Sequence, residues 1–499
     1  MNFLLPRQIT PGFQLSLQDA AALKDTTYND SIERFLDLIL NQGGATIGPD
    51  AIASAKIFML DTVGVICAGA QAPGLDKLLA AAGLWGKAER PELGATVWNT
   101  GQVMPPPVAV LANAYQCHAL EFDCVYEEGV VIPAAPIFSA LMFKAEQLSN
   151  QGHPPGGEAL LKAFVVAVEV SCSLGLAANG SMFFFRPGTA GTFGALAAMA
   201  CLAPLSREQL RYAFGIAYAQ MGGTMQAHEE GSMMLAMQMG FAARNAVQAY
   251  DMAAAGVSSA VQVLDGRFGY FNNFEHGNKL PEAIAQLGAP WKVTRLSHKP
   301  FPSGRVTHGT IRALRELRNE LALAPEQAYD AIKAITLELP ALGMQLVGRP
   351  MRPSPAPNYA RLCVPFVAAT ELLYGSVDPT SFYPDRLADP AIEALAQKVN
   401  AVEAAHPNPN AFYPQKLIFE LQDGRVFERP IPYAWGHPDM PLNRTDREEK
   451  FMQCYRLGRG NAQATHSEEK ISNMIHWFDN IESHTDCQEL LKFLAVSNS

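Results

Sequence analysis

The polar residues of segment 117–136 form an acidic cluster in an otherwise apolar half of the chain. The segment reads CHALEFDCVYEEGVVIPAAP, and hydrophobic, helix-like stretches precede and follow it. A carboxylate such as Asp123 or a phenol such as Tyr126 can move protons when a fold holds it beside a substrate. Asp123 could equally fix the following turn through backbone N–H groups, and Tyr126 could be a half-buried aromatic residue. Glu127 and Glu128 are expected on a solvated loop face.

A second group of chemically competent residues lies in one short stretch farther along the chain, with Lys299, Ser303, Arg305 and His308 close together. Lysine and arginine bind carboxylates, and an imidazole can move a proton near neutral pH. The sequence therefore predicts substrate binding by Lys299, Ser303 and Arg305, with His308 as an acid or base. His308 could instead be a satisfied imidazole at a helix start.

Arg186 is a third candidate, because it stands just before Pro187-Gly188 and near a helix start. Backbone N–H groups at helix starts point at anions, and a guanidinium there could bind a carboxylate through two hydrogen bonds. A structural salt bridge is the alternative. The glycines of 183–194 fit helix packing better than nucleotide binding, since no strand precedes them. His228, beside two glutamates, is expected at the surface.

Composition bounds the class of protein. The chain has 499 residues, 48% of them hydrophobic and 17% charged, which fits two or three globular domains. A net charge of −10 argues against nucleic acid and anionic membranes as partners. Eight scattered cysteines, without a CxxC pair or zinc-ligand spacing, suit a reducing compartment and predict no metal. The first residues lack a signal-peptide pattern, so we expect a cytoplasmic protein.

The elements that must position these residues fall into two groups. Apolar residues at helical spacing dominate to about residue 285. Alternation over 334–339, a helix over 389–402 and a hairpin with strands at 416–421 and 425–431 then indicate a smaller α/β unit. The predicted fold is mainly α. It comprises an N-terminal extension (1–27), a large all-helical domain (28–287 and 438–499) and an α/β lid domain (288–437), with a ligand cleft between the domains.

Several motifs, in order along the chain, carry a resemblance to a known family. They are LDTVGVICAG (60–69), LEFDCVYEEGVVIPAAP (120–136), RPGTAGTFGALAAMACL (186–202), EEGSMMLAMQMGFAARNAV (229–247), KPFPSGRVTHGTIRAL (299–314), VGRP (347–350) and LQDGRVFERPIPYAWGHPDMPL (421–442). Together they resemble the MmgE/PrpD family, which includes 2-methylcitrate dehydratase, cis-aconitate decarboxylase and iminodisuccinate epimerase. The resemblance implies a helical domain with an α/β lid, a homodimer and no metal or organic cofactor.

The same resemblance implies an altered set of proton-transfer groups. Asp123 matches an acidic position of the family, and Lys299 and His308 are retained. At other positions this chain departs from the family, which has a histidine, a lysine, an acid or a hydroxyl residue there. The residues found in this chain are Cys124, Val125, Tyr126, Ile132, Arg186, Leu235, Met239, Gly304 and Leu346. Three hypotheses follow. The chain is a divergent lyase or isomerase acting on a small, anionic or polar substrate, an inactive binding or scaffold subunit, or a standard dehydratase or decarboxylase.

Overall fold

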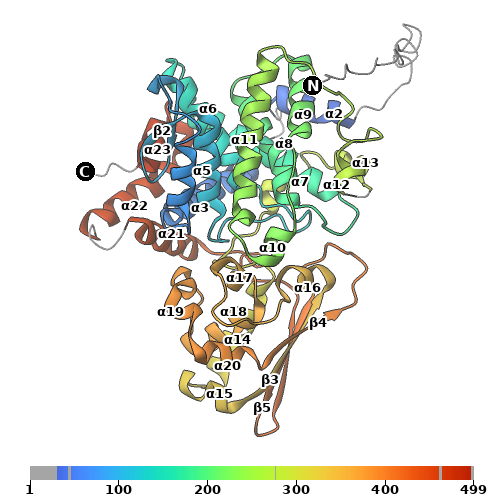
Figure 1. Cartoon of the computed structure of the whole chain (residues 1–499), viewed down its shortest axis with the longest axis vertical. Helices are drawn as coiled ribbons and strands as arrows, with labels where there is room; N and C mark the ends of the chain where they lie inside the picture. The colour runs from blue at the N-terminus through green and yellow to red at the C-terminus, as the bar shows by residue number, and fades with distance from the viewer. Residues whose placement is uncertain (1–30, 43–46, 276, 460–463, 496–499) are drawn as a thin grey trace, which may run out of the picture.

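The computed structural model describes residues 31–42, 47–275, 277–459 and 464–495. The N-terminal extension that we predict for 1–27 lies outside the described residues. Figure 1 shows a large helical part above a smaller part built around a sheet. The predicted fold class, mainly α with a smaller α/β lid, is confirmed.

The helical part buries long, apolar helices that are rich in small residues. Its helices are α2 (Ser31–Leu40), α3 (Pro49–Ala68), α4 (Leu75–Ala82), α5 (Pro106–His118), α6 (Ala134–Asn150), α7 (Gly157–Ala177), α8 (Arg186–Leu202), α9 (Arg207–Ala219), α10 (Gln226–Glu230), α11 (Met234–Ala254), α12 (Tyr270–Phe274) and α13 (Leu280–Ala285). A short hairpin, β1 (Ala95–Val97) with β2 (Gln102–Met104), precedes α5. Because small side chains let helix axes approach closely, α5, α6, α7, α8 and α11 pack into one core.

The C-terminal helices return to this helical part. They are α21 (Arg444–Arg459), α22 (Ala464–Asp479) and α23 (Gln488–Leu494), and α21 packs along α3. The stretch Trp291–Leu296 also contributes side chains to the helical core. The precise domain boundaries stay a prediction.

Helices α3 and α7 are long and apolar enough to cross a membrane, if only length and composition are considered. Inside the protein, however, 67% and 83% of their most apolar windows are buried. Core helices of globular domains pass the same test, so two such helices are weak support for a membrane span. All eight cysteines are buried and free, as their apolar surroundings in the sequence predict.

The lid is a four-stranded mixed sheet covered by helices. The strand order is β4-β3-β5-β6, and β4 (Val399–Ala404) runs parallel to β3 (Ile332–Pro340). Strand β5 (Gln415–Leu421) is antiparallel to β3, and β6 (Val426–Ile431) is antiparallel to β5. The lid helices are α14 (Thr307–Glu320), α15 (Ala328–Ala331), α16 (Ala341–Val347), α17 (Pro357–Arg361), α18 (Val364–Tyr374), α19 (Pro384–Leu387) and α20 (Pro390–Ala396). The predicted hairpin is confirmed, and Gly424 supplies the positive φ of its turn.

Two local predictions are wrong. The predicted helix over 389–402 ends at Ala396, because the chain turns there and enters β4. From sequence we also expect a glycine-rich loop over 183–194 that runs into a helix over 195–202, but α8 already begins at Arg186. Gly191 and Gly194 lie against α6 and α7, where an added Cβ would come within 2.7–2.8 Å of neighbouring atoms, so they serve helix packing as expected.

Candidate active site

The loop between α5 and α6 carries the acidic cluster and is held at several points. Val125 exchanges backbone hydrogen bonds with Ser297, and Tyr126 does so with Val131. Two of its residues have left-handed backbone conformations, Glu121 with φ +53° and Val130 with φ +55°. Such a conformation costs roughly 1–3 kcal/mol for a residue other than glycine, and it persists where the surroundings enforce it. Strain of this kind concentrates at functional sites.

Glu121 lies at the centre of a buried chain of charges. Lys299 Nζ donates to Glu121 Oε2 at 2.8 Å. On the other side, His118 Nε2 lies 3.2 Å from Glu121 Oε1, a contact of charges rather than a well-aligned hydrogen bond. His118 Nδ1 contacts both carboxylate oxygens of Asp123 at 2.9 and 3.1 Å. All four side chains are buried, so their charges are screened little by solvent.

This arrangement fixes the protonation of its members. Burial lowers the pKa of the His118 imidazole, but the carboxylates of Asp123 and Glu121 outweigh this effect and raise it to about 10. Burial also disfavours the ionised form of Glu121, yet Lys299 and His118 hold the pKa of its carboxyl well below the usual range. Near neutral pH, His118 is therefore an imidazolium and Glu121 a carboxylate.

A cavity of about 60 Å³ adjoins this charged chain at the junction of the helical part and the lid. Its polar lining comes from Glu121, His228, Lys299 and Arg305. Every other lining residue is apolar, among them Val130, whose backbone is strained. The cavity lining is therefore mostly apolar, with these four polar or charged side chains among it.

Of the predicted substrate-binding residues, Lys299 and Arg305 line this cavity. Lys299 Nζ has one hydrogen bond within the described part of the chain, so two of its donors stay free for a ligand. Arg305 is committed elsewhere, because its Nε donates to Glu127 Oε1 at 2.7 Å and its other nitrogens donate to the carbonyls of His298, Ala434 and Trp435. The expectation that Glu127 is solvated is wrong, since this ion pair buries it.

His308 and Ser303 are buried behind Arg305 and are not among the cavity-lining residues. His308 Nε2 lies 3.2 Å from the Ser303 carbonyl, and Arg305 Nη1 lies 3.4 Å from His308 Nδ1. The Ser303 carbonyl can only accept, so Nε2 carries a proton and donates to it. Burial and the nearby Arg305 hold its pKa well below the usual value. Ser303 Oγ pairs with Thr307 Oγ1 at 2.8 Å. Of the two residues, only His308 contacts Arg305, and Ser303 holds the His308 ring through its carbonyl.

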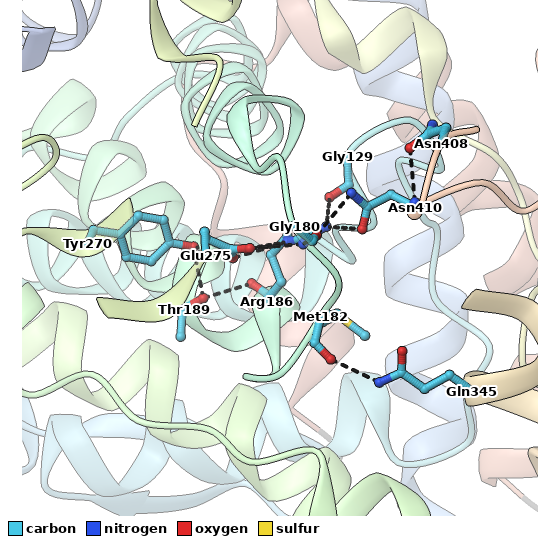
Figure 2. Close-up of polar contacts among 10 residues, drawn as sticks. All are labelled: Gly129, Gly180, Met182, Arg186, Thr189, Tyr270, Glu275, Gln345, Asn408 and Asn410. Atoms are coloured by element: carbon cyan, nitrogen blue, oxygen red, sulfur yellow. Dashed lines mark hydrogen bonds and ion pairs between the residues drawn. The ribbon is translucent and has the colours of Figure 1, made fainter. Parts of the chain in front are cut away.

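Arg186 binds protein groups with all five of its donors, as Figure 2 shows. Arg186 Nε donates to Glu275 Oε1 at 3.0 Å, and Nη2 lies 2.9 Å from Glu275 Oε2. Nη1 donates to the Gly129 carbonyl and to Asn410 Oδ1. The Gly180 carbonyl accepts the last donor. Arg186 therefore forms the structural salt bridge that was the alternative expectation, and it has no donor left for a substrate carboxylate. Since Asn410 belongs to the lid, this cluster joins the two parts of the protein.

Tyr126 also lies away from the cavity lining. Its hydroxyl donates to Glu128 Oε2 at 3.2 Å, and burial with the adjacent carboxylate raises its pKa far above the ordinary value. The structure thus places it as a buried aromatic residue within the loop between α5 and α6. Asp123 contacts His118 and not the cavity, so it acts through the imidazole.

The positions where the family resemblance implies lost catalytic groups divide into two sets. Ile132, Gly304 and Leu346 line the cavity and make its walls apolar. From the family resemblance we also expect Leu235 and Met239 to make the pocket more apolar, but both pack in the helical core and do not line the cavity. No cluster of three or more side chains suited to a metal ion occurs in the part of the chain that the structure describes.

Three polar residues of the site were not predicted: His118, Glu121 and His228. The first two carried a signal, because a histidine, a glutamate and an aspartate occur within six residues at a helix end. The expectation of a surface position for His228 is wrong, since it is buried and lines the cavity. Arg349 from the lid donates to its Nδ1 at 3.0 Å.

Comparisons with known proteins agree with this architecture. A model of the MmgE/PrpD N-terminal domain matches residues 33–283, and a model of the C-terminal domain matches 301–474. A cis-aconitate decarboxylase of Homo sapiens is 28% identical over 457 residues, which cover 89% of this chain and 90% of that protein. One from Aspergillus terreus is 24% identical over 465 residues, covering 90% and 92%. The two domain models span most of the chain, which therefore belongs to the MmgE/PrpD family.

Proposed function

We propose that this chain is a lyase that acts by proton transfer on a small carboxylic acid with an apolar substituent. The Glu121–Lys299 pair at the end of an otherwise apolar cavity carries the proposal. Lys299 would bind the substrate carboxylate, which would take part of the lysine charge away from Glu121 and let the Glu121 carboxylate accept a proton from the adjacent carbon. The decarboxylase relatives support a lyase at the level of the family.

The charges around the cavity favour a substrate with fewer carboxylates than cis-aconitate, which has three. A buried carboxylate needs a cationic or hydrogen-bonding partner of its own. Among the described lining residues, Lys299 keeps two of its three donors free, whereas Arg305 uses four of its five donors on Glu127 and backbone carbonyls. Ile132 and Leu346 present apolar walls in its vicinity. One bound carboxylate and an apolar remainder match this lining.

Proton exchange in D₂O tests the proposal whichever bond of the substrate breaks. Purified protein is incubated with but-2-enoate, 2-methylbut-2-enoate, cis-aconitate and 2-methylcitrate, and deuterium uptake and products are followed by ¹H NMR and mass spectrometry. We expect reaction with the less charged acids, and a loss of at least about 100-fold in Lys299→Met and Glu121→Gln. Lys333→Met, at an exposed lysine of β3, is the matched control. Rapid turnover of cis-aconitate or 2-methylcitrate would contradict the proposed substrate class.

A binding or scaffold subunit is the second candidate, and the size of the cavity favours it. Pockets that hold small-molecule ligands commonly measure roughly 300–1,000 Å³, whereas this cavity measures about 60 Å³. Under the lyase proposal, the helical part and the lid would have to separate for a substrate to enter. Saturable binding of an acid without deuterium exchange or product would support the second candidate and reject the lyase.

A homodimer, a cytoplasmic location and independence of cofactors remain predictions.

A further inference from the structure

His228 is a buried histidine that the proposed proton transfer between Lys299 and Glu121 does not use. It belongs to the short helix α10 and is 6% exposed. Arg349, in the lid after α16, contacts two atoms of His228 through its guanidinium. Its Nη1 donates to the carbonyl of His228 at 2.8 Å, and its Nη2 lies 3.0 Å from His228 Nδ1. The imidazole is therefore held from the lid side.

The contact with Arg349 determines which nitrogen of His228 carries the proton. A guanidinium can only donate, so His228 Nδ1 must be the acceptor and the proton must reside on Nε2. Nε2 has no hydrogen-bond partner within the described ranges of the chain, and the residue lines the cavity. The ring thus offers a ligand one N–H donor and no acceptor.

The surroundings also keep this imidazole neutral. Burial and the charge of Arg349 lower the pKa of His228 to about 3. Glu121 raises this pKa and the imidazolium of His118 lowers it further. The charged side chains of Lys299 and Arg305 line the same cavity. A neutral imidazole with Nδ1 blocked cannot accept a proton at neutral pH, which excludes a general base.

We propose that His228 Nε2–H is a catalytic hydrogen-bond donor, which binds a carbonyl or carboxylate oxygen of the substrate and stabilises the negative charge that develops there. This inference rests on the proposed function and adds a third member to the pair of Lys299 and Glu121. A fixed neutral donor stabilises an enolate-like oxygen without losing its own proton. Arg349 is the positioning residue, because it acts on the substrate only through the imidazole.

The tautomer can be measured without a substrate. Protein labelled with ¹⁵N-histidine is studied by long-range ¹H–¹⁵N correlation between pH 5 and pH 9. We expect the His228 signals of a single Nε2–H tautomer with no titration over this range. In Arg349→Gln, Nδ1 loses its donor and His228 should titrate closer to its ordinary pKa of about 6.5. An Nδ1–H tautomer, or titration near pH 6.5 in the unaltered protein, would overturn the proposal.

The catalytic role is tested on whichever acid of the panel exchanges deuterium. His228→Gln keeps an N–H donor at a similar reach and should stay within about tenfold of the original kcat, whereas His228→Phe should lose about 100-fold. A merely structural histidine would not separate the two variants in this way, and equal kcat values in them would refute the role. Absence of any reaction would reject the proposed lyase, while the NMR result would still decide the tautomer.

Discussion

The charged chain around Glu121 predicts a specific dependence of stability on pH. The pKa of His118 rises from 6.5 to about 10 on folding, against the effect of burial and through Asp123 and Glu121. A group whose pKa is raised in the folded state contributes stability that is complete below the unfolded pKa and is lost as pH rises through the folded pKa. The loss therefore falls between about pH 6.5 and pH 10.

The magnitude follows from the same shift. A rise of about 3.5 in pKa corresponds to at most about 5 kcal/mol at 1.36 kcal/mol for each pKa unit. Between pH 7 and pH 10, roughly 3 kcal/mol of this contribution should disappear. Asp123→Asn removes the carboxylate that contacts His118 Nδ1 at 2.9 Å, so the variant should be less stable at pH 7 and should lose less on going to pH 10.

Urea unfolding at pH 7, 8.5 and 10 measures this difference. Lysines, tyrosines and cysteines also titrate near pH 10, so the relevant quantity is the free energy of unfolding of the variant subtracted from that of the original protein at each pH. Asp50→Asn, at an exposed position in the first turn of α3, controls for the loss of a carboxylate. Parallel curves for Asp123→Asn and the original protein would refute the assignment of His118 as an imidazolium.

Three further outcomes are expected. Glu121→Gln should reduce the loss of stability at acidic pH. A carboxyl with a depressed pKa contributes stability that is present above its unfolded pKa of about 4.5 and is lost as pH falls through the folded pKa. The same loss of unfolding free energy at acidic pH in the variant and the original protein, measured by denaturant titration, would contradict this. Arg186→Met should cost about 3–5 kcal/mol in free energy of unfolding because it leaves Glu275 buried without its cation, whereas the exposed Arg207→Met should cause no measurable change; equal effects would refute the burial argument. Gly231→Ala should lower the melting temperature more than Gly256→Ala, because both have positive φ but only at Gly231 would a Cβ come within 2.4 Å of the Tyr359 nitrogen; similar shifts would argue against that contact.

The fold was largely predictable from local patterns. Helical spacing marked α2 and α3, and the Asp423-Gly424 turn marked the hairpin. Strand β4 was missed because its six residues follow α20 after two residues and its register is set by β3, about 65 positions away. Parallel pairing of this kind leaves little local signal, since the partner strand is distant in the sequence.

The site was predictable in location but not in detail. Lys299 was identified from its charge and its motif, and it lines the cavity. Its partnership with Glu121 joins residues 178 positions apart, so no spacing rule could reveal it. His228 appeared to be a surface residue because two glutamates follow it, yet Arg349, 121 positions later, buries it. Arg186 had the chemistry to bind a carboxylate, but Glu275 supplies one from the protein itself.

Buried polar contacts of this protein are repeatedly shared between its two parts. Glu127 pairs with Arg305, Asn410 accepts from Arg186, and His228 accepts from Arg349. A chimera that joined one part to the corresponding part of a relative would strand each of these groups without its partner. Natural recombination at the junction should therefore be selected against, and these pairs should change together during divergence. Substitutions at the junction would then have to be coordinated between the helical part and the lid.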